Sequence, residues 1–327
     1  MNKRRKLLVA LGASALAAPF GSFAQQQVKV WRIGFMSSRA ESGPNEEVFR
    51  LGMRELGYVE GQNIAIEWRF SPRNVDQYPE IAAELVRLKV DCMVTATFSA
   101  SLAAKLATPT IPIVMTSVND DPVRRGLVAS LARPGANVTG FILLGPELAG
   151  KRLQLLKEVL PNASRMAILW DRNVQGSVSH VKETEAAASR LGVQLQSLDV
   201  SDEKGLENAF QVAGKGRAQA LVVVGTGFVN IHQARIANLA IKTRLPAIYP
   251  NSQFVLAGGL MSYAADGVEQ FRGAATYVDK ILKGAKPADL PVQQPTKFEF
   301  LVNQMAAKAL GIKIPNSILV QATKVIE

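Results

Sequence analysis

The sequence alternates short apolar runs with amphipathic helical segments, and no other feature limits the possible folds as strongly. The apolar runs are too short for helices and lie between turn residues, which is typical of buried strands. The segments between them place apolar residues at helical spacing. Strands that alternate with helices in this way indicate right-handed βαβ units and a parallel sheet. In the first part of the chain the expected strands are residues 28–36, 64–70, 91–95 and 111–115, and the expected helices are residues 46–56 and 75–88 and a segment that ends at Ala107.

The alternation restarts after Phe141, where a short extended piece, residues 138–141, leads away from the first series. Two series of similar length predict an α/β protein with two Rossmann-like lobes, each with a parallel sheet. The end of the chain is too short for a core of its own, so we expect it to complete one of the lobes. In the second series the expected strands are residues 165–170, 194–200, 218–224, 245–249 and 298–302, and the expected helices are residues 147–160, 178–191, 206–213, 233–243 and 268–282.

A polar cluster follows the apolar run at residues 111–115. Pro122 suits the first turn of a helix with Asp121 as its N-cap, and the sequence Arg-Pro-Gly at residues 133–135 would end that helix. Ligands of open α/β sheets bind beyond the carboxyl ends of parallel strands. The cluster therefore suggests a ligand cleft beside a crossing between two lobes, and the alternative is an ordinary βα loop with a helix cap. The cluster comprises Thr116, Ser117, Asn119, Asp120 and Asp121.

The N-terminus has the three parts of a secretory signal peptide. Four cations at residues 3–6 precede an apolar stretch at residues 7–18, and small residues at Ser22 and Ala24 fit a cleavage site after Ala24. The apolar stretch is too short to span a bilayer. Arg4 and Arg5 leave the twin-arginine route open, and we rank general secretion first. Residues 1–24 are thus expected to be removed.

Charge and cysteine content limit the possible partners and location. The net charge of the whole chain is +11, and removal of the four N-terminal cations takes Lys plus Arg from 38 to 34 against 27 acids, which leaves +7. No basic run carries interleaved aromatic residues, so nucleic acid is not an expected partner. The lone Cys92 lies in an apolar run and reads as a core residue. No cysteine follows the expected signal peptide, so there is no site for lipid attachment there, and we expect an unanchored protein in the periplasm.

The residues that an enzyme would need are missing from the sequence. His180 and His232 are the only histidines, and neither has a partner at metal-ligand spacing, so we expect surface roles for both. There is no nucleophile elbow and no phosphate-binding loop of the Walker type. Residues 34–38 depart from the dinucleotide fingerprint, and the sequence Gly-Thr-Gly at residues 225–227 imitates it only in part. We therefore expect no catalysis, no cofactor and no metal.

Several segments closely resemble a known family. They include FRLGMRELGYVEGQN at residues 49–63, GLVASLARPGANVTG at residues 126–140 and GKRLQLLKEVL at residues 150–160. These segments are similar to the tryptophan/tyrosine-type substrate-binding proteins of ABC transporters, which have the type I periplasmic binding protein fold. The sequence departs from the family's usual pattern at residues 95–98 and 119–121, where a ligand cleft is expected. The other matching segments are residues 81–90, 110–115, 245–250, 257–263 and 275–297.

The resemblance implies a chain that crosses between its lobes three times. The crossings are expected near Phe141, near Ser262 and Tyr263, and near residues 291–295. One lobe would then comprise residues 28–141 and 264–292, and the other residues 142–262 and 293–327. The resemblance also implies a monomer that serves an ABC permease in the inner membrane.

The candidate ligand-binding residues lie at the expected strand ends. Helix N-termini beside them expose backbone N–H groups that suit a carboxylate. Asp121 or Asp171 could meet an ammonium group, and Phe98, Trp170 or Tyr249 could pack on a side chain. The alternatives are that Asp121 only caps a helix and that Trp170 belongs to the core. The full set is Ser37, Ser38, Thr97, Phe98, Ser99, Ser117, Asn119, Asp121, Trp170, Asp171, Asn173, Thr226, Tyr249 and Tyr263.

These observations favour an exported solute-binding protein that closes two lobes around a small molecule and delivers it to an ABC permease. The preferred ligand is an amino acid, aromatic ones included. A small carboxylate and other organic solutes remain open alternatives. A second hypothesis is an exported sensor that uses the same cleft and docks on a receptor kinase. A third is an exported enzyme.

Overall fold

The computed structural model describes residues 29–39, 41–71 and 75–327. The expected signal peptide and its cleavage after Ala24 lie outside these residues. Within them, no helix combines the length and the apolar character that a membrane span requires.

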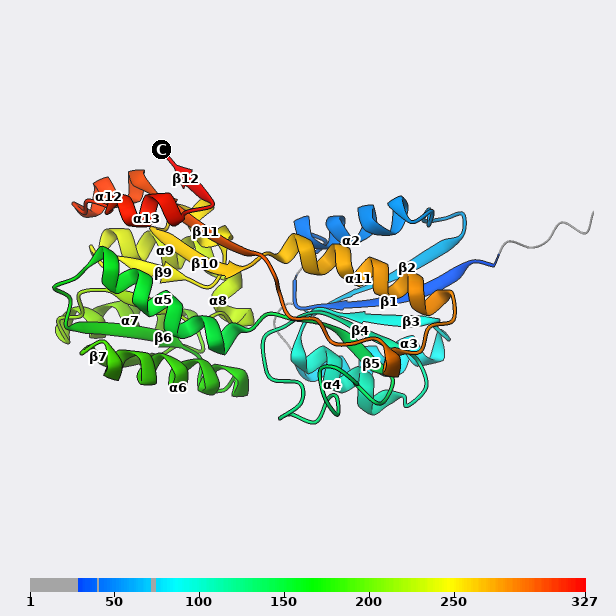
Figure 1. Cartoon of the computed structure of the whole chain (residues 1–327). Helices are drawn as coiled ribbons and strands as arrows, with labels where there is room; N and C mark the ends of the chain where they lie inside the picture. The colour runs from blue at the N-terminus through cyan, green and yellow to red at the C-terminus, as the bar shows by residue number, and fades with distance from the viewer. Residues whose placement is uncertain (1–28, 40, 72–74) are drawn as a thin grey trace, which may run out of the picture. The chain divides into compact units, whose positions relative to one another are not determined.

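The first half of the chain forms a five-stranded parallel sheet with the order β2-β1-β3-β4-β5 (Figure 1). Residues such as Ile33 and Phe35 point to one face and Met36 to the other, as the alternation of side chains along a strand requires. The strands are β1 (Trp31–Ser37), β2 (Ile64–Phe70), β3 (Cys92–Thr95), β4 (Ile113–Val118) and β5 (Val138–Ile142).

Helices cover both faces of this sheet. On one face, α2 (Pro44–Glu55) and α11 (Gly267–Leu282) bury Phe49 and Phe271 against β1 and β3. On the other face lie α3 (Tyr78–Arg87), which follows a 3₁₀ turn η1 (Val75–Gln77), and α4 (Phe98–Ala107). Cys92 is fully buried in the first of these cores, as predicted.

The second sheet has seven strands in the order β12-β11-β10-β9-β8-β6-β7. β10 and β11 pair antiparallel, and the remaining neighbours in this sheet are parallel. The strands are β6 (Arg165–Trp170), β7 (Gln194–Asp199), β8 (Leu221–Val223), β9 (Ala247–Tyr249), β10 (Met261–Ala265), β11 (Phe298–Asn303) and β12 (Lys324–Ile326).

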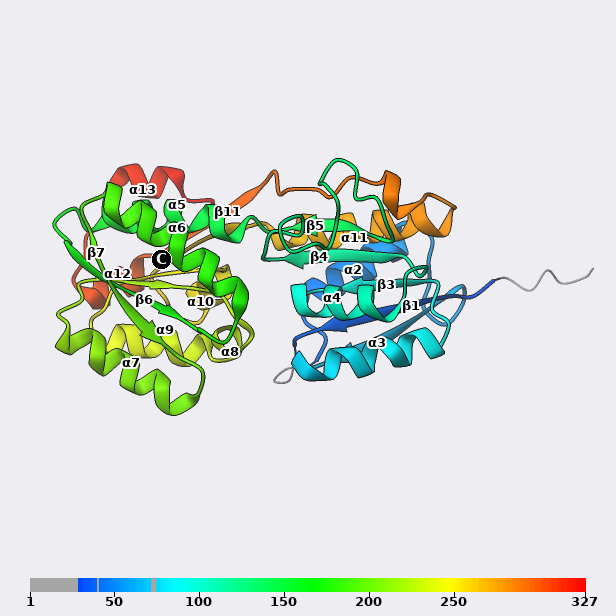
Figure 2. The same cartoon turned by 90° about the horizontal axis from the view of Figure 1, so that it is seen from below.

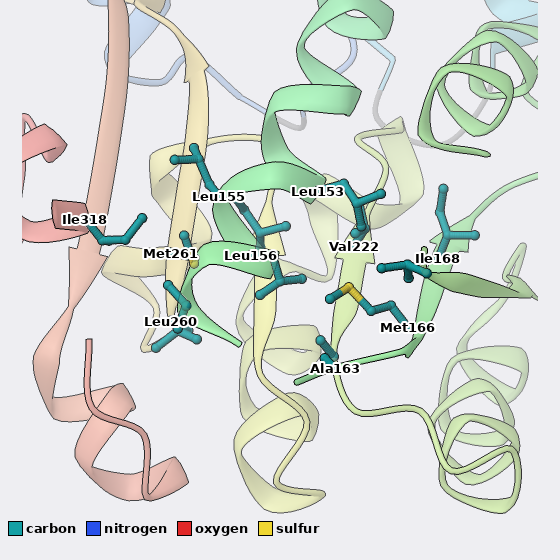
Figure 3. Close-up of a cluster of buried hydrophobic side chains, with 14 of the residues drawn as sticks. Leu153, Leu155, Leu156, Ala163, Met166, Ile168, Val222, Leu260, Met261 and Ile318 are labelled. Atoms are coloured by element: carbon teal, nitrogen blue, oxygen red, sulfur yellow. The ribbon is translucent and has the colours of Figure 1, made fainter. Parts of the chain in front are cut away.

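This sheet is also covered on both faces (Figure 2). One core contains side chains of α5 (Gly145–Val159), α6 (Gln175–Arg190), α12 (Gln304–Leu310) and α13 (Asn316–Gln321). Figure 3 shows this core, in which Leu156 of α5 lies beside Met166 and Val222. The other core contains side chains of α7 (Glu203–Lys215), α8 (Gly227–Ile231), α9 (Gln233–Lys242) and α10 (Ser252–Leu256).

In the described part of the chain, the backbone passes between the two sheets three times. It leaves β5 for α5, leaves β10 for α11, and returns through a segment that follows the 3₁₀ turn η2 (Pro287–Asp289) and leads to β11. β10 stays in the seven-stranded sheet to Ala265. Gln293 still pairs with β5, since its N–H donates to the Gly140 carbonyl at 2.8 Å. The lobe boundaries drawn from the sequence remain a prediction.

The prediction of a helix after Pro122 is wrong. Residues 122–126 form turns, in which the N–H groups of Leu127 and Val128 both donate to the Pro122 carbonyl, at 2.7 and 3.1 Å. Gly126 has φ +71°, a left-handed value that interrupts a right-handed helix. The proline and the aspartate cap were correct local signals for a turn of helix, but the glycine stops it from continuing.

Candidate functional site

The carboxyl ends of β1, β3 and β4 bring three groups of predicted site residues to one edge of the five-stranded sheet. The strands are direct neighbours, so the segments that follow them lie side by side. The groups are Ser37 and Ser38 at the end of β1 and just after it, residues 97–99 after β3, and Ser117, Asn119 and Asp121 at the end of β4 and just after it.

Local hydrogen bonds occupy several of these hydroxyl groups. Ser37 is buried and donates to Glu46 Oε1 at 3.0 Å, and the same carboxylate accepts from the Gly43 N–H at 3.1 Å. Thr97 caps α4 by accepting from the Ala100 N–H, and Ser117 donates to the Ala96 carbonyl at 3.1 Å. Ser38, Phe98 and Asn119 are half-buried and Ser99 is exposed, so these residues offer surface to a solute.

The turn after β4 contains an arrangement that the sequence did not reveal. Asp120 is buried, and its Oδ1 accepts from the Asp121 N–H at 2.9 Å. Its Oδ2 lies 3.3 Å from Nε of Arg125, whose guanidinium carbon sits 4.8 Å from the centroid of the Phe98 ring. Asp121 Oδ1 accepts from the N–H groups of Val123 and Arg124, so it fixes the turn.

A second polar edge follows β6, β8 and β9 of the seven-stranded sheet. The Trp170 indole donates to Ser197 Oγ at 2.6 Å. Asp171 is buried and accepts from the Asn173 N–H at 2.9 Å, and its burial raises the pKa of its carboxyl. Thr226 caps α8 by accepting from the Val229 N–H.

The two predicted tyrosines differ in their exposure. Tyr249 is 0% exposed and stacks on Phe254 with the ring centroids 4.9 Å apart, so no surface of it is open to a solute in this structure. Tyr263 in β10 is half-buried and stacks on Phe298. Its carbonyl accepts from Nε of Arg152 at 2.8 Å.

A pocket of about 220 Å³ lies at the crossing between β5 and α5. Its volume is below the about 300–1,000 Å³ that pockets for drug-sized ligands have, so it would hold only a small solute or part of one. Asp120 is paired with Arg125, and the carboxylates of Asp121 and Glu147 would favour a positively charged group such as an ammonium. Asp121 is the one residue of the predicted set that lines it. The lining comprises Asp120, Asp121, Pro122, Val123, Leu131, Ile142, Leu144, Gly145, Glu147 and Gln294.

The surface role expected for His180 is wrong, since its side chain lies buried in α6. The ring lies near the backbone of Asn119, but neither ring nitrogen makes a hydrogen bond of good geometry to a described residue. Burial, together with the positive charge of Arg152, lowers the pKa of His180 to about 3, so the ring is neutral at neutral pH. His232 is partly buried and its Nε2 lies 3.3 Å from Glu203 Oε1. In the described ranges, no three His, Cys, Asp or Glu side chains gather where they could hold a metal ion.

The sequence predicted the strand ends. It did not predict that Glu46 would accept from Ser37 or that Asp120 would pair with Arg125. From the sequence, no role was assigned to Arg125. Its contact with Phe98 joins two loops that only the pairing of β3 with β4 brings together.

The chain belongs to the ABC transporter substrate binding protein family, whose profile matches residues 45–326. This is a family of substrate-binding proteins and not of enzymes. The chain is 25% identical over 268 residues to the tyrosine-binding protein of Clostridioides difficile strain R20291, a match that covers 81% of this chain and 76% of that protein.

Two solved structures illustrate the similarity. The ABC domain from Streptococcus pneumonia in complex with L-Trp has a TM-score of 0.82 and 25% identity, with 91% of this chain and 100% of that chain covered. A periplasmic binding protein from Burkholderia mallei has a TM-score of 0.58 and 13% identity, over 86% of this chain and 81% of that one. The shared fold is that of the type I periplasmic binding proteins.

Proposed function

We propose that the protein is the periplasmic solute-binding component of an ABC importer and that its ligand is an amino acid, aromatic ones included. The observation that carries the proposal is the pairing of the family fold with polar strand ends and a carboxylate-lined pocket at a chain crossing. The relatives named above, one a tyrosine-binding protein and one a complex with L-Trp, support the amino-acid class.

The proposed ligand is a zwitterion, and the pocket offers partners for its ammonium group. Asp121 and Glu147 line the pocket and would attract an ammonium group. Ser99, which is exposed at the polar edge of the five-stranded sheet, is proposed to contact the rest of the solute. Contacts to both halves of the fold would favour a closed state, because a ligand shifts a conformational equilibrium by its difference in affinity for the two states.

The crossing at β5 to α5 is the proposed hinge. Leu144 has φ +50° there, a left-handed value that costs a leucine about 1–2 kcal/mol. Strained residues of this kind cluster at sites that change conformation. Leu144 also lines the pocket, so a ligand in the pocket would contact the hinge itself.

A thermal-shift screen of the purified protein against the L-amino acids tests the proposal. A ligand present at 100 times its Kd stabilises the folded state by about 2.7 kcal/mol, which raises Tm measurably. We expect one or a few amino acids to raise Tm, with isothermal titration to confirm them. The proposal fails if no amino acid shifts Tm and none gives a binding isotherm.

The importer role needs a separate test in the producing cell. Deletion of the gene should abolish uptake of the radiolabelled amino acid that the purified protein binds, and the intact gene should restore it. Unchanged uptake would contradict the importer role, and a lost transcriptional response to the same solute would favour a sensor.

A further inference from the structure

We propose that Arg125 is the carboxylate-binding residue of the site, held in position by Phe98 and Asp120. The inference rests on the proposed function, since it assigns the part of an amino-acid ligand that this residue recognises. The contacts that support the inference lie in one sheet and in the two loops that follow β3 and β4.

The side chain of Arg125 is fixed from two directions. Its guanidinium lies over the face of Phe98, at 4.8 Å from the ring centroid, which is a favourable cation–π distance. Nε lies 3.3 Å from Oδ2 of Asp120, whose side chain is only 4% exposed. A long surface side chain gains little from an ion pair because it must be ordered first, whereas Arg125 is already ordered by both contacts.

The hydrogen-bonding groups of Arg125 are nevertheless unused. Nε is buried and has no hydrogen-bond acceptor in the described part of the chain, because the approach to Asp120 is an ion pair without hydrogen-bond geometry. The Nη groups make no hydrogen bond to any described residue either, and the side chain keeps 24% of its surface exposed. A planar guanidinium with free N–H groups matches a carboxylate through two parallel hydrogen bonds.

The location of Arg125 agrees with this role. It follows β4 and contacts the first residue of the helix after β3, at the edge where α/β folds bind their ligands. Asp120 contacts Arg125 and also lines the pocket that contains Asp121 and Glu147. Arg125 and the pocket carboxylates therefore place opposite charges next to each other, as an α-amino acid carries them.

Isothermal titration with ligands that carry a carboxylate, and with analogues that lack it, tests the inference. The probes are L-tyrosine and L-tryptophan and their decarboxylated analogues tyramine and tryptamine. The proteins are the wild type, Arg125→Gln, Arg125→Lys and Arg133→Gln, the last being an exposed arginine in the same loop region. Circular dichroism of each variant checks that it is folded.

We expect Arg125→Gln to weaken binding of the amino acids by about 10–100-fold, as loss of a charged hydrogen bond does, and to leave binding of the amines unchanged. The amino-acid affinity of Arg125→Lys should lie between those of the wild type and Arg125→Gln, since lysine keeps the charge but loses the paired donors. Arg133→Gln should bind as the wild type does. If Arg125→Gln is unfolded, Arg125→Lys still tests the inference by the ratio of tyrosine to tyramine affinity.

Two results would overturn the inference, and they are distinguishable. Equal amino-acid affinity of Arg125→Gln and wild type would remove the role of Arg125 and leave the proposed function standing. A wild type that binds none of the L-amino acids would remove the proposed function and this inference with it.

Discussion

Replacement of Gly140 by alanine should destabilise the protein by about 2–6 kcal/mol. Gly140 in β5 has φ +125°, a conformation that costs an L-residue about 1–3 kcal/mol. A methyl group there would also press against the backbone of Met115 in β4, with its carbon 2.9 Å from the Met115 carbonyl carbon. Overpacking of this kind costs about 1–3 kcal/mol more, because a backbone in a paired strand cannot move aside.

Gly126→Ala is the matched control, because Gly126 also has positive φ, +71°, but nothing lies within 4 Å of the added carbon. It should cost only the backbone strain of about 1–2 kcal/mol. Urea unfolding of the wild type and both variants, followed by far-ultraviolet circular dichroism, gives the free energies of unfolding. If the two variants agree within about 0.5 kcal/mol, the collision with Met115 does not exist as described.

Two further predictions concern buried titratable groups. The pKa of His180 is about 3 in the folded state, against 6.5 in the unfolded state, so below pH 6.5 the unfolded chain binds a proton that the folded chain excludes. Stability should therefore fall as pH drops from 6.5 towards 3, by about 2 kcal/mol between pH 7 and pH 5. Urea midpoints at the two pH values should show a smaller loss in His180→Gln, and an equal loss would contradict the assignment. The Cys92 thiol is fully buried and its pKa is raised by burial, so a thiol reagent should label it only in denaturant. Rapid labelling of the native protein would show that the core around β3 opens.

Strand positions could be predicted well where the sequence itself carries the pattern. β2 and β6 begin and end at the residues expected, since their apolar runs are bounded by turns. The antiparallel pairing of β10 with β11 could not be predicted, because it depends on the path of the chain between sheets and not on local sequence. The turn after Pro122 was missed because Gly126 outweighs the helix signals before it.

The candidate site was predictable as a set of strand ends, but the role of each side chain was not. Tyr249 ends a strand like the other candidates, yet its ring fills the core beside α10, a short helix that the sequence did not reveal. The partners of Arg125 lie in other loops or depend on the turn that forms, so no spacing along the chain could identify them.

The repeated passage of the chain between the sheets fixes the order in which the protein can be completed during synthesis. α11 shares the cover of one face of the first sheet with α2, but it follows β10 in the sequence, so that face stays only partly covered until much of the second sheet has emerged. Phe49 and its neighbours in that core lack their contacts with Phe271 until α11 is made. A fragment that stops at β5 would keep part of this apolar face permanently uncovered and should aggregate.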